Sequence, residues 1–230
     1  MYDDEQHDDN QQSGGQRSPL ITDLYTRYIV EQDTPDFVQK VTERYSNATI
    51  ERLVRSTDRE TRRAAIMALG LVGDYESNHV LGRALVDKDR GVRALAENSI
   101  RAVWRRAGND YQRDQLQKVA DFVEMKRYSE AVVRATELIE QAPWFAEVWN
   151  QRAIAYYHVE RFADAIRDCR QALEINPYHF GAAAGMGQCH LRLKDRQSAL
   201  ECFRRALRLN PSLENVRAQV VYLQKSLKGD

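Results

Sequence analysis

The sequence predicts an all-α protein, an α-solenoid in which helix-turn-helix repeats wind into a right-handed superhelix. Apolar residues recur at helical spacing from Leu20 onwards, without the alternation typical of strands. Glycines and prolines fall where such helices should end or turn. Two stretches of the chain also repeat, one with a period of 31 residues and the other with a period of 34.

The composition is that of an ordinary globular chain with no bulk charge. Of the 230 residues, 43% are hydrophobic and 30% are charged, and Lys plus Arg and Asp plus Glu each number 34. Because the formal net charge is zero, no overall field draws the chain to nucleic acid or to a membrane surface. Any function that depends on charge must be local.

The cysteines and the N-terminal residues bear on the cellular compartment. Cys169, Cys189 and Cys202 lack CxxC spacing and lie in apolar helical stretches, which favours reduced thiols packed as small hydrophobic groups in a cytoplasmic protein. The first ten residues contain no cationic segment followed by an apolar one, and no run approaches the roughly 18 apolar residues of a membrane span. We therefore expect neither export nor membrane insertion.

The chain should become helical after a polar N-terminal segment. Residues 1–19 are rich in Asp, Gln, Asn, Ser and Gly, and we expect them to form a disordered acidic tail. Ile21 and Tyr25 then begin a helical pattern, and Thr34 can cap a second helix that opens with Pro35.

The first repeat compares the segment that starts at Asp58 with the one that starts at Asp89. The 31-residue offset superposes Ala65 on Ala96, and each unit follows a short apolar helix. An aspartate before a helix can accept backbone N–H groups, and alanines let neighbouring helices approach closely. The pattern resembles HEAT-like repeats, and we assign residues 20–108 to HEAT-like repeats with N-terminal helices.

The second repeat rests on three prolines, Pro143, Pro177 and Pro211, which are 34 residues apart. Small and apolar side chains recur at the same spacing: Ala131, Ala165 and Ala199; Ala135, Cys169 and Phe203; Leu138, Ala172 and Ala206. The pattern over residues 146–211 resembles tetratricopeptide repeats, while residues 112–145 depart from it at Gln115 and Val119. We assign residues 109–228 to an array of three units and a C-terminal capping helix.

The junction between the two arrays, residues 105–113, is too short for a flexible tether. We expect the arrays to stack on each other, with Trp104 and Tyr111 near the seam.

No residue pattern indicates catalysis. The five histidines are scattered, and HExxH, GxSxG, GxxxxGK[ST] and DxDxDG motifs are absent from the sequence. The segment that starts at Gly181, GAAAGMGQ, follows no predicted strand, so we interpret its small residues as helix packing and not as a phosphate loop. We expect no enzymatic activity, no cofactor and no metal site.

The resemblance to tetratricopeptide repeats implies a concave groove lined by the first helix of each pair. The groove would bind a protein or peptide partner, and Gly181 and Gly185 would leave one wall open to a ligand backbone. The implied groove residues are Arg113, Gln117, Asn150, Gln151, Ile154, Tyr157, His158, Gln188 and Arg192. Related domains that hold chaperone C-terminal carboxylates place Lys, Asn and Arg where this chain has Leu116, Ala120, Gln151, Gly181 and Gly185, which argues against that ligand.

Two other functions compete with this adaptor or scaffold interpretation. Nucleic acid could bind the arginine-rich first array, although pairing of these arginines with nearby carboxylates is the stronger explanation. Arg93, Glu97, Arg101 and Arg105 are spaced by four and can pair along a helix, and Arg62 and Arg93 can bond the neighbouring Asp58 or Asp89. The arginines concerned are Arg52, Arg55, Arg59, Arg62, Arg63, Arg83, Arg90, Arg93, Arg101, Arg105 and Arg106. The resemblance to HEAT-like repeats also admits a role like that of bilin lyases, but no acid or nucleophile can be named for it.

Overall fold

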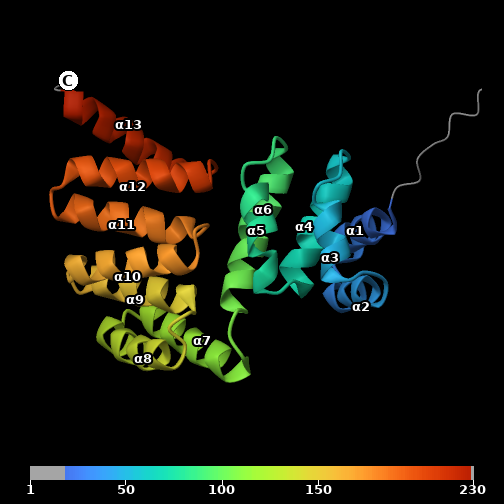
Figure 1. Ribbon diagram of the computed structural model, residues 1–230, viewed down its shortest axis with the longest axis horizontal. Coiled ribbons are helices and arrows are strands. Elements are labelled where there is room, and N and C mark those ends of the chain that lie inside the picture. The colour runs from blue at the N-terminus through green and yellow to red at the C-terminus, as the bar shows by residue number, and fades with distance from the viewer. Residues whose placement is uncertain (1–18, 229–230) are drawn as a thin grey trace, which may run out of the picture.

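The computed structural model describes residues 19–228, and every regular element within that range is helical (Figure 1). The predicted tail therefore lies, except for Pro19, outside the described residues. In chain order the helices are α1 (Leu20–Glu31), α2 (Thr34–Arg44), α3 (Asn47–Leu53), α4 (Arg59–Val72), the 3-10 turn η1 (Tyr75–Ser77), α5 (Asn78–Ala84), α6 (Arg90–Arg105), α7 (Asp110–Glu124), α8 (Tyr128–Gln141), α9 (Ala146–His158), α10 (Phe162–Ile175), α11 (Phe180–Arg192), α12 (Arg196–Leu209) and α13 (Glu214–Lys228). The prediction of an all-α solenoid is confirmed.

The first array consists of the pairs α3–α4 and α5–α6, with α1 and α2 covering α4. Asp58 caps α4 by accepting a 2.8 Å hydrogen bond from the Thr61 amide, and Asp89 caps α6 through a 2.9 Å bond from the Val92 amide. Ala65 on α4 is fully buried where α4 packs against α6, and its partner in the repeat on α6 is buried equally. The 31-residue repeat is therefore one of structure as well as of sequence.

The cap of α2 lies one residue before the predicted one. The carboxylate of Asp33 accepts a 3.0 Å hydrogen bond from the Asp36 amide, while the Thr34 hydroxyl lies 3.5 Å from that of Tyr28. The interpretation of Thr34 as the cap was wrong because both residues are good caps and only the backbone geometry distinguishes them.

The second array consists of α7–α8, α9–α10 and α11–α12, with α13 packed on α12. The small and apolar side chains that recur every 34 residues are buried at all nine positions. The turn inside each pair shares a further feature, because Lys126, Glu160 and Lys194 have φ values of 61°, 61° and 63°. These three residues are 34 apart, so the first pair has the same turn as the other two.

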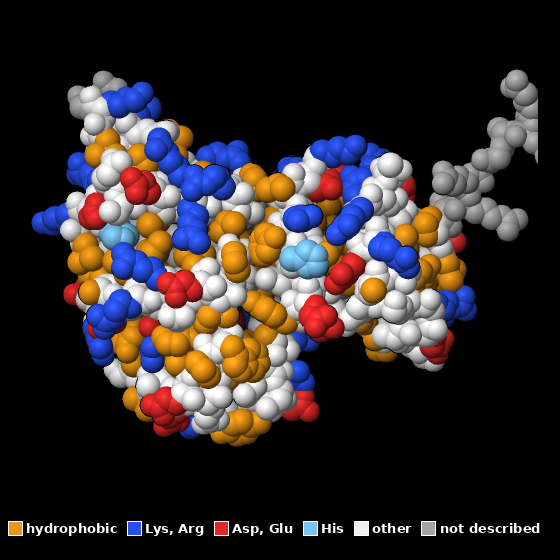
Figure 2. Space-filling view, viewed as in Figure 1, with side chains coloured by type: hydrophobic (Ala, Val, Ile, Leu, Met, Phe, Trp, Pro, Cys, Tyr) orange, Lys and Arg blue, Asp and Glu red, His pale blue; other side chains and the backbone are white. Residues whose placement is uncertain are grey.

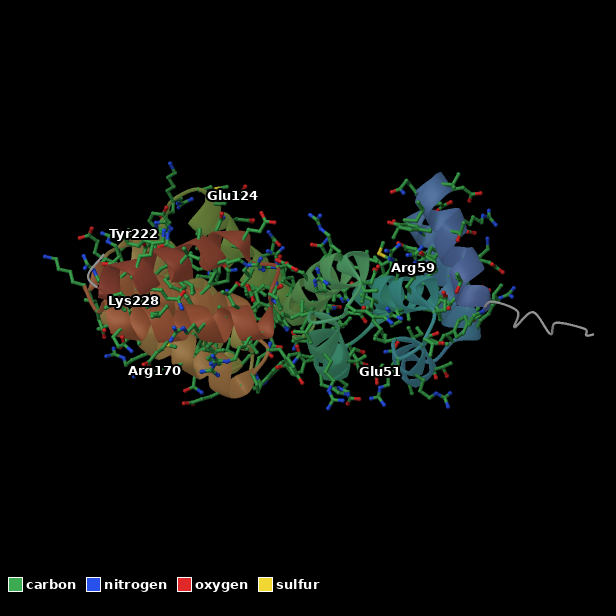
Figure 3. The ribbon with its side chains drawn as sticks, turned by 90° about the horizontal axis from the view of Figure 1, so that it is seen from above. Glu51, Arg59, Glu124, Arg170, Tyr222 and Lys228 are labelled. Carbon is green, nitrogen blue, oxygen red and sulfur yellow. The ribbon has the colours of Figure 1, made fainter. Side chains whose placement is uncertain are left out.

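The two arrays meet side-on. In Figure 1 the helices α9–α13 run across the view, whereas α4, α5 and α6 run up and down it. Seen from above in Figure 3, the arrays lie beside each other, and Tyr222 and Lys228 mark α13 at the end of the molecule opposite α1. The side of α6 therefore faces the turns that connect one pair of the second array to the next.

Trp104 forms the centre of this seam, as predicted. Its ring is 2% exposed, lies 4.3 Å from the ring of His179 in a stacked arrangement and packs 5.2 Å from Phe180. Its indole N–H donates a 2.7 Å hydrogen bond to Asn78 Oδ1. Tyr111, by contrast, is 56% exposed on the first turn of α7, so its predicted place at the seam was wrong.

Two asparagines before the period-setting prolines complete the seam. Asn176 Oδ1 accepts hydrogen bonds from the Tyr178 amide within its own turn and from Asn78 Nδ2 of the first array. Asn210 likewise accepts from the Ser212 amide and donates a 2.9 Å bond to Glu97 on α6. These turns thus hold the first array as well as ending a repeat.

Candidate functional site

A hollow in the concave face lies between α6, α9 and α11, and we call it the main hollow. It encloses about 260 Å³ and is lined by Arg101 from α6, by Asn150, Ala153, Ile154 and Tyr157 from α9, by Cys169 from α10, and by Gly181, Gly185, Gln188 and Cys189 from α11. The predicted residues Asn150, Ile154, Tyr157 and Gln188 are therefore brought together here.

The glycines of α11 show that this wall is open. A Cβ added at Gly187 would lie 2.6 Å from the Phe203 ring, so that glycine is needed for helix packing. A Cβ at Gly185 would meet only Cys169 Sγ at 3.5 Å, and one at Gly181 would meet nothing closer than 3.5 Å, which are ordinary contacts. Interpreting all the small residues of this segment as packing was therefore wrong for Gly181 and Gly185.

A smaller side hollow of about 130 Å³ lies next to the first. It is lined by Arg105, Arg113, Leu116, Gln117, Ala120, Glu147 and Gln151. It gathers the predicted residues Arg113, Gln117 and Gln151. Arg113 is held there by a 2.8 Å hydrogen bond to the Gly108 carbonyl and by an ion pair with Asp110.

A buried carboxylate, Glu147, lies beneath the side hollow. It accepts hydrogen bonds from Gln151 Nε2 at 2.7 Å and from Asn150 Nδ2 at 3.4 Å, and its other oxygen lies 3.0 Å from His179 Nε2. Because the Ala182 amide donates to His179 Nδ1, the ring proton is on Nε2 and points to the carboxylate.

Burial alone would raise the pKa of the Glu147 carboxyl, but the hydrogen bonds from His179 and Gln151 and the positive charge of Arg105 lower it below the usual value. The group thus stays ionised and fixes the amides of Asn150 and Gln151. These amides are positioned by the protein instead of being free to rotate.

His158 and Arg192 lie outside both hollows. His158 is exposed and stacks on Tyr128 at 4.4 Å between ring centroids. Arg192 forms an exposed 3.0 Å ion pair with Glu160 and lies over Phe162, with its guanidinium carbon 4.8 Å from the ring centroid. Exposed pairs of this kind contribute little to stability, so Arg192 can exchange its partner at low cost.

Sequence reasoning missed the contribution of α6 to the groove. Arg101 lines the main hollow with its guanidinium 4.5 Å from the centroid of the Phe180 ring, and Arg105 lines the side hollow. Both belong to the first array, and only the side-on seam brings them to the groove. Their i, i+4 spacing was visible in the sequence, but the face that it covers was not.

Many of the arginines in the first array are already bound. Arg62 forms a bidentate pair with Asp87 at 3.0 and 3.1 Å, and Arg63 forms another with Asp89 at 2.9 Å. Arg106 is half-buried and donates to the carbonyl groups of Gly70 and Gly73. The expectation that Arg62 bonds Asp58 was wrong, because the Asp58 carboxylate caps α4 and the loop of the next repeat supplies Asp87.

The charges on the surface are mixed. On the face that Figure 2 shows, Lys and Arg side chains lie on both halves, with Asp and Glu between them. Over residues 19–228, no group of three or more His, Cys, Asp or Glu side chains has a metal-binding arrangement. No helix in that range is long and apolar enough to span a bilayer.

Stacked helix pairs with a concave face define the class of this protein as a helical repeat protein. The chain carries HEAT repeats, matched over residues 46–137, and tetratricopeptide repeats, matched over residues 146–179 and 181–213. The HEAT match extends past residue 108 into α8, and the boundary between the arrays at that residue stays a prediction.

Two relatives illustrate the sequence similarity of this chain to known proteins. The chain is 28% identical over 144 residues to a TPR repeat-containing protein of Rhizobium etli, which is 63% of this chain and 71% of that protein. It is 25% identical over 118 residues to the Hsp70-Hsp90 organizing protein 1 of Glycine max, covering 50% of this chain but only 21% of the relative.

Among solved structures, the first TPR of Spaghetti (RPAP3) bound to the HSP90 peptide SRMEEVD matches with a TM-score of 0.50 and 22% identity, covering 51% of this chain and 94% of that one. A likeness at this level of identity shows the fold alone.

Proposed function

We propose that this protein is an interaction adaptor whose concave groove binds an extended segment of a partner protein, without covalent chemistry. The observation that carries the proposal is the open wall at Gly181 and Gly185, opposite Ile154 and Tyr157 in the main hollow. A ligand backbone can approach the glycines closely, while its side chains contact the apolar and aromatic groups opposite.

Polar side chains of the main hollow can orient the ligand, and Glu147 holds one of them, Asn150. Asn150 and Gln188 line the main hollow and can pair with the backbone of a bound segment, because amides both donate and accept. Arg101 and Arg105 add cationic groups from the first array, which favours a ligand with carboxylates. Several relatives are named for the chaperones that they organize, and the RPAP3 domain is described with a bound HSP90 peptide that contains acidic residues.

This chain would have to hold any such carboxylate with different residues. The positions at which chaperone-binding relatives place Lys, Asn and Arg include Gly181 and Gly185, which have no side chain to offer. The cations that line the two hollows are instead Arg101 and Arg105 from α6 and Arg113 from α7.

A peptide selected from a random display library tests the proposal. Its affinity for the wild type would be compared with that for Gly185→Leu, which fills the main hollow, and for Tyr157→Ala, which removes its aromatic wall. We expect each change to weaken binding at least about tenfold, whereas Lys118→Ala on the exposed side of α7 should have little effect.

Thermal unfolding of each variant controls for loss of fold. We expect Gly185→Leu to fold, because a Cβ at Gly185 meets only an ordinary contact. Unchanged peptide affinity in both groove variants would place the binding surface elsewhere. A steep fall of oligonucleotide binding with salt, in place of peptide binding, would favour the arginine-rich alternative.

A further inference from the structure

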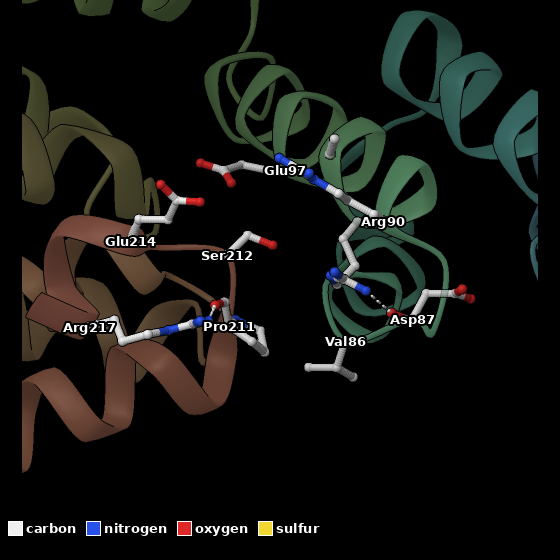
Figure 4. Close-up of a pocket in the computed structure, with 10 residues that line it drawn as sticks. Val86, Asp87, Arg90, Glu97, Pro211, Ser212, Glu214 and Arg217 are labelled. Carbon is white, nitrogen blue, oxygen red and sulfur yellow. Dashed lines mark hydrogen bonds between the residues drawn. The ribbon is translucent and has the colours of Figure 1, made fainter.

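A second cleft lies where the end of the first array faces the start of α13, and we call it the junction cleft. It encloses about 510 Å³ (Figure 4), and its polar lining includes Arg90, Arg93 and Glu97 from α6 and Ser212, Glu214 and Arg217 from the other side. It is separate from the main hollow and from the side hollow, and the proposed peptide site does not use it.

The internal repeat shows how an arginine at this position binds. Arg62 of the first repeat donates through Nη1 to the carbonyl groups of Ser56 and Thr57, at 3.0 and 3.1 Å. Its other edge, Nε and Nη2, makes the bidentate pair with the Asp87 carboxylate, which the loop of the next repeat supplies.

Arg93 stands 31 residues later and repeats only the first half of this arrangement. Its Nη1 donates to the carbonyl groups of Asp87 and Lys88, at 2.8 and 3.2 Å, which are the equivalents of the two carbonyl groups that Arg62 binds. The residue 31 positions after Asp87 is Lys118, so the sequence places no carboxylate at the position equivalent to Asp87.

No carboxylate within residues 19–228 bonds the Nε and Nη2 edge of Arg93, although its side chain lines the cleft and is half-buried. A guanidinium anchored through one edge presents the other in a fixed direction, and that edge matches the two oxygens of a carboxylate.

The charges around the cleft favour an anion. Of its carboxylates, Asp87 is paired with Arg62, and Glu97 is bonded by Arg101 at 3.2 Å and by Asn210 at 2.9 Å. After these pairs, Arg90, Arg93 and Arg217 face Glu214 alone. The remaining balance is positive.

We propose that the junction cleft binds an acidic side chain of a protein partner, whose carboxylate takes the place on Arg93 that Asp87 takes on Arg62. The precedent within this chain is the pair of Arg62 with Asp87, in which the anion is a carboxylate. Val86, Ala94 and Pro211 also line the cleft and suit the aliphatic stem of a glutamate better than they suit a phosphate chain.

Fluorescein-labelled hexaglutamate is the probe, and its anisotropy is measured with the full chain at low salt. Arg93→Gln should weaken binding about tenfold, because a charge-assisted bidentate pair is lost. The matched control, Arg204→Gln, removes one exposed positive charge from α12, and it should change the affinity less than twofold.

A second variant leaves Arg93 in place. Ser212→Glu introduces a carboxylate into the cleft from the other side, and it should compete with the probe and weaken it at least fivefold while leaving thermal stability equal or higher. This result would not depend on how well Arg93→Gln folds.

Three results would overturn the inference. They are failure of hexaglutamate to bind the wild type, equal losses in Arg93→Gln and Arg204→Gln, and preferential binding of hexathymidylate that depends on Arg93, which would assign the cleft to nucleic acid. Because Gly185→Leu leaves the junction cleft intact, loss of groove binding and loss of hexaglutamate binding are distinguishable.

Discussion

The seam between the arrays can be tested at Trp104, whose replacement by alanine should destabilise the whole molecule. The indole is 2% exposed and packs against His179 and Phe180, and burying a tryptophan removes about 150–250 Å² from water. At about 25 cal/mol per Å², that burial stabilises the fold by about 4–6 kcal/mol, in line with the roughly 3–5 kcal/mol measured for large aromatic residues replaced by alanine.

A second substitution separates the loss of unfolding free energy into a hydrogen-bond contribution and a packing contribution. Trp104→Phe keeps most of the apolar ring but removes the 2.7 Å hydrogen bond to Asn78, whose buried oxygen is then left without that donor. The expected cost of this loss is about 1–3 kcal/mol. Both variants lack the hydrogen bond, so the difference between them measures the packing of an aromatic ring against the turn at residues 178–180.

The assay is urea unfolding of the full chain, followed by far-UV circular dichroism. Trp144→Ala is the matched control, because Trp144 is 50% exposed and lies in the turn before α9. We expect Trp104→Ala to lose about 4 kcal/mol and to unfold in two steps as the arrays uncouple. A single transition with a loss under about 1 kcal/mol, no larger than that of the control, would refute the role of the seam.

Three further outcomes follow from single residues. The hydrogen bond from Arg63 holds the pKa of Asp89 at about 2. This carboxylate should therefore stabilise the fold above about pH 4 and lose that effect as the pH falls towards 2. In urea titrations, Asp89→Asn should lower the unfolding free energy at pH 7 but hardly at pH 2. Lys126 has a φ of 61°, so Lys126→Gly should raise the unfolding free energy by up to about 1 kcal/mol, and an unchanged or lower thermal midpoint would contradict the strain. Burial raises the pKa of Cys169, and it raises that of Cys189 to about 11. Iodoacetamide at pH 8 should therefore label the cysteines of the unfolded chain much faster than those of the native one. Rapid labelling of the native protein would count against the burial of these thiols.

The repeat periods predicted most of the fold because each position that recurs in the sequence has a direct structural cause. A proline every 34 residues ends a helix, and the small residues between recur where helices cross, so counting positions found the buried ones. The same counting gave the aspartate caps of α4 and α6.

The seam could not be read in the same way. Trp104 and His179 are 75 residues apart, and neither local pattern records that one ring stacks on the other. Asn176 and Asn210 match ordinary turn residues, and their contacts with the first array depend on the angle between the two arrays. The predicted groove therefore lacked the wall that α6 contributes. Arg101 and Arg105 were predicted only as part of an arginine-rich surface of the first array.

The partners of the arginines illustrate the same limit. Charge spacing along α6 correctly predicted the pair between Arg101 and Glu97, since residues four apart on a helix are neighbours. It misassigned Arg62, whose partner Asp87 comes from the following repeat, 25 residues away.

The turns at residues 176–180 and 210–213 both rest against helices of the first array, with α6 contacted by each. In a solenoid of stacked helix pairs, small rotations between neighbouring pairs add up along its length and set the curvature of the superhelix. Helix α6 contacts the turn that joins the second pair to the third and the turn that joins the third pair to α13, so it restrains the rotation of the third pair relative to both neighbours. A ligand that needs a wider groove must therefore bend α6 or detach it from these turns. The stiffness of the groove is thus set by a helix of the first array.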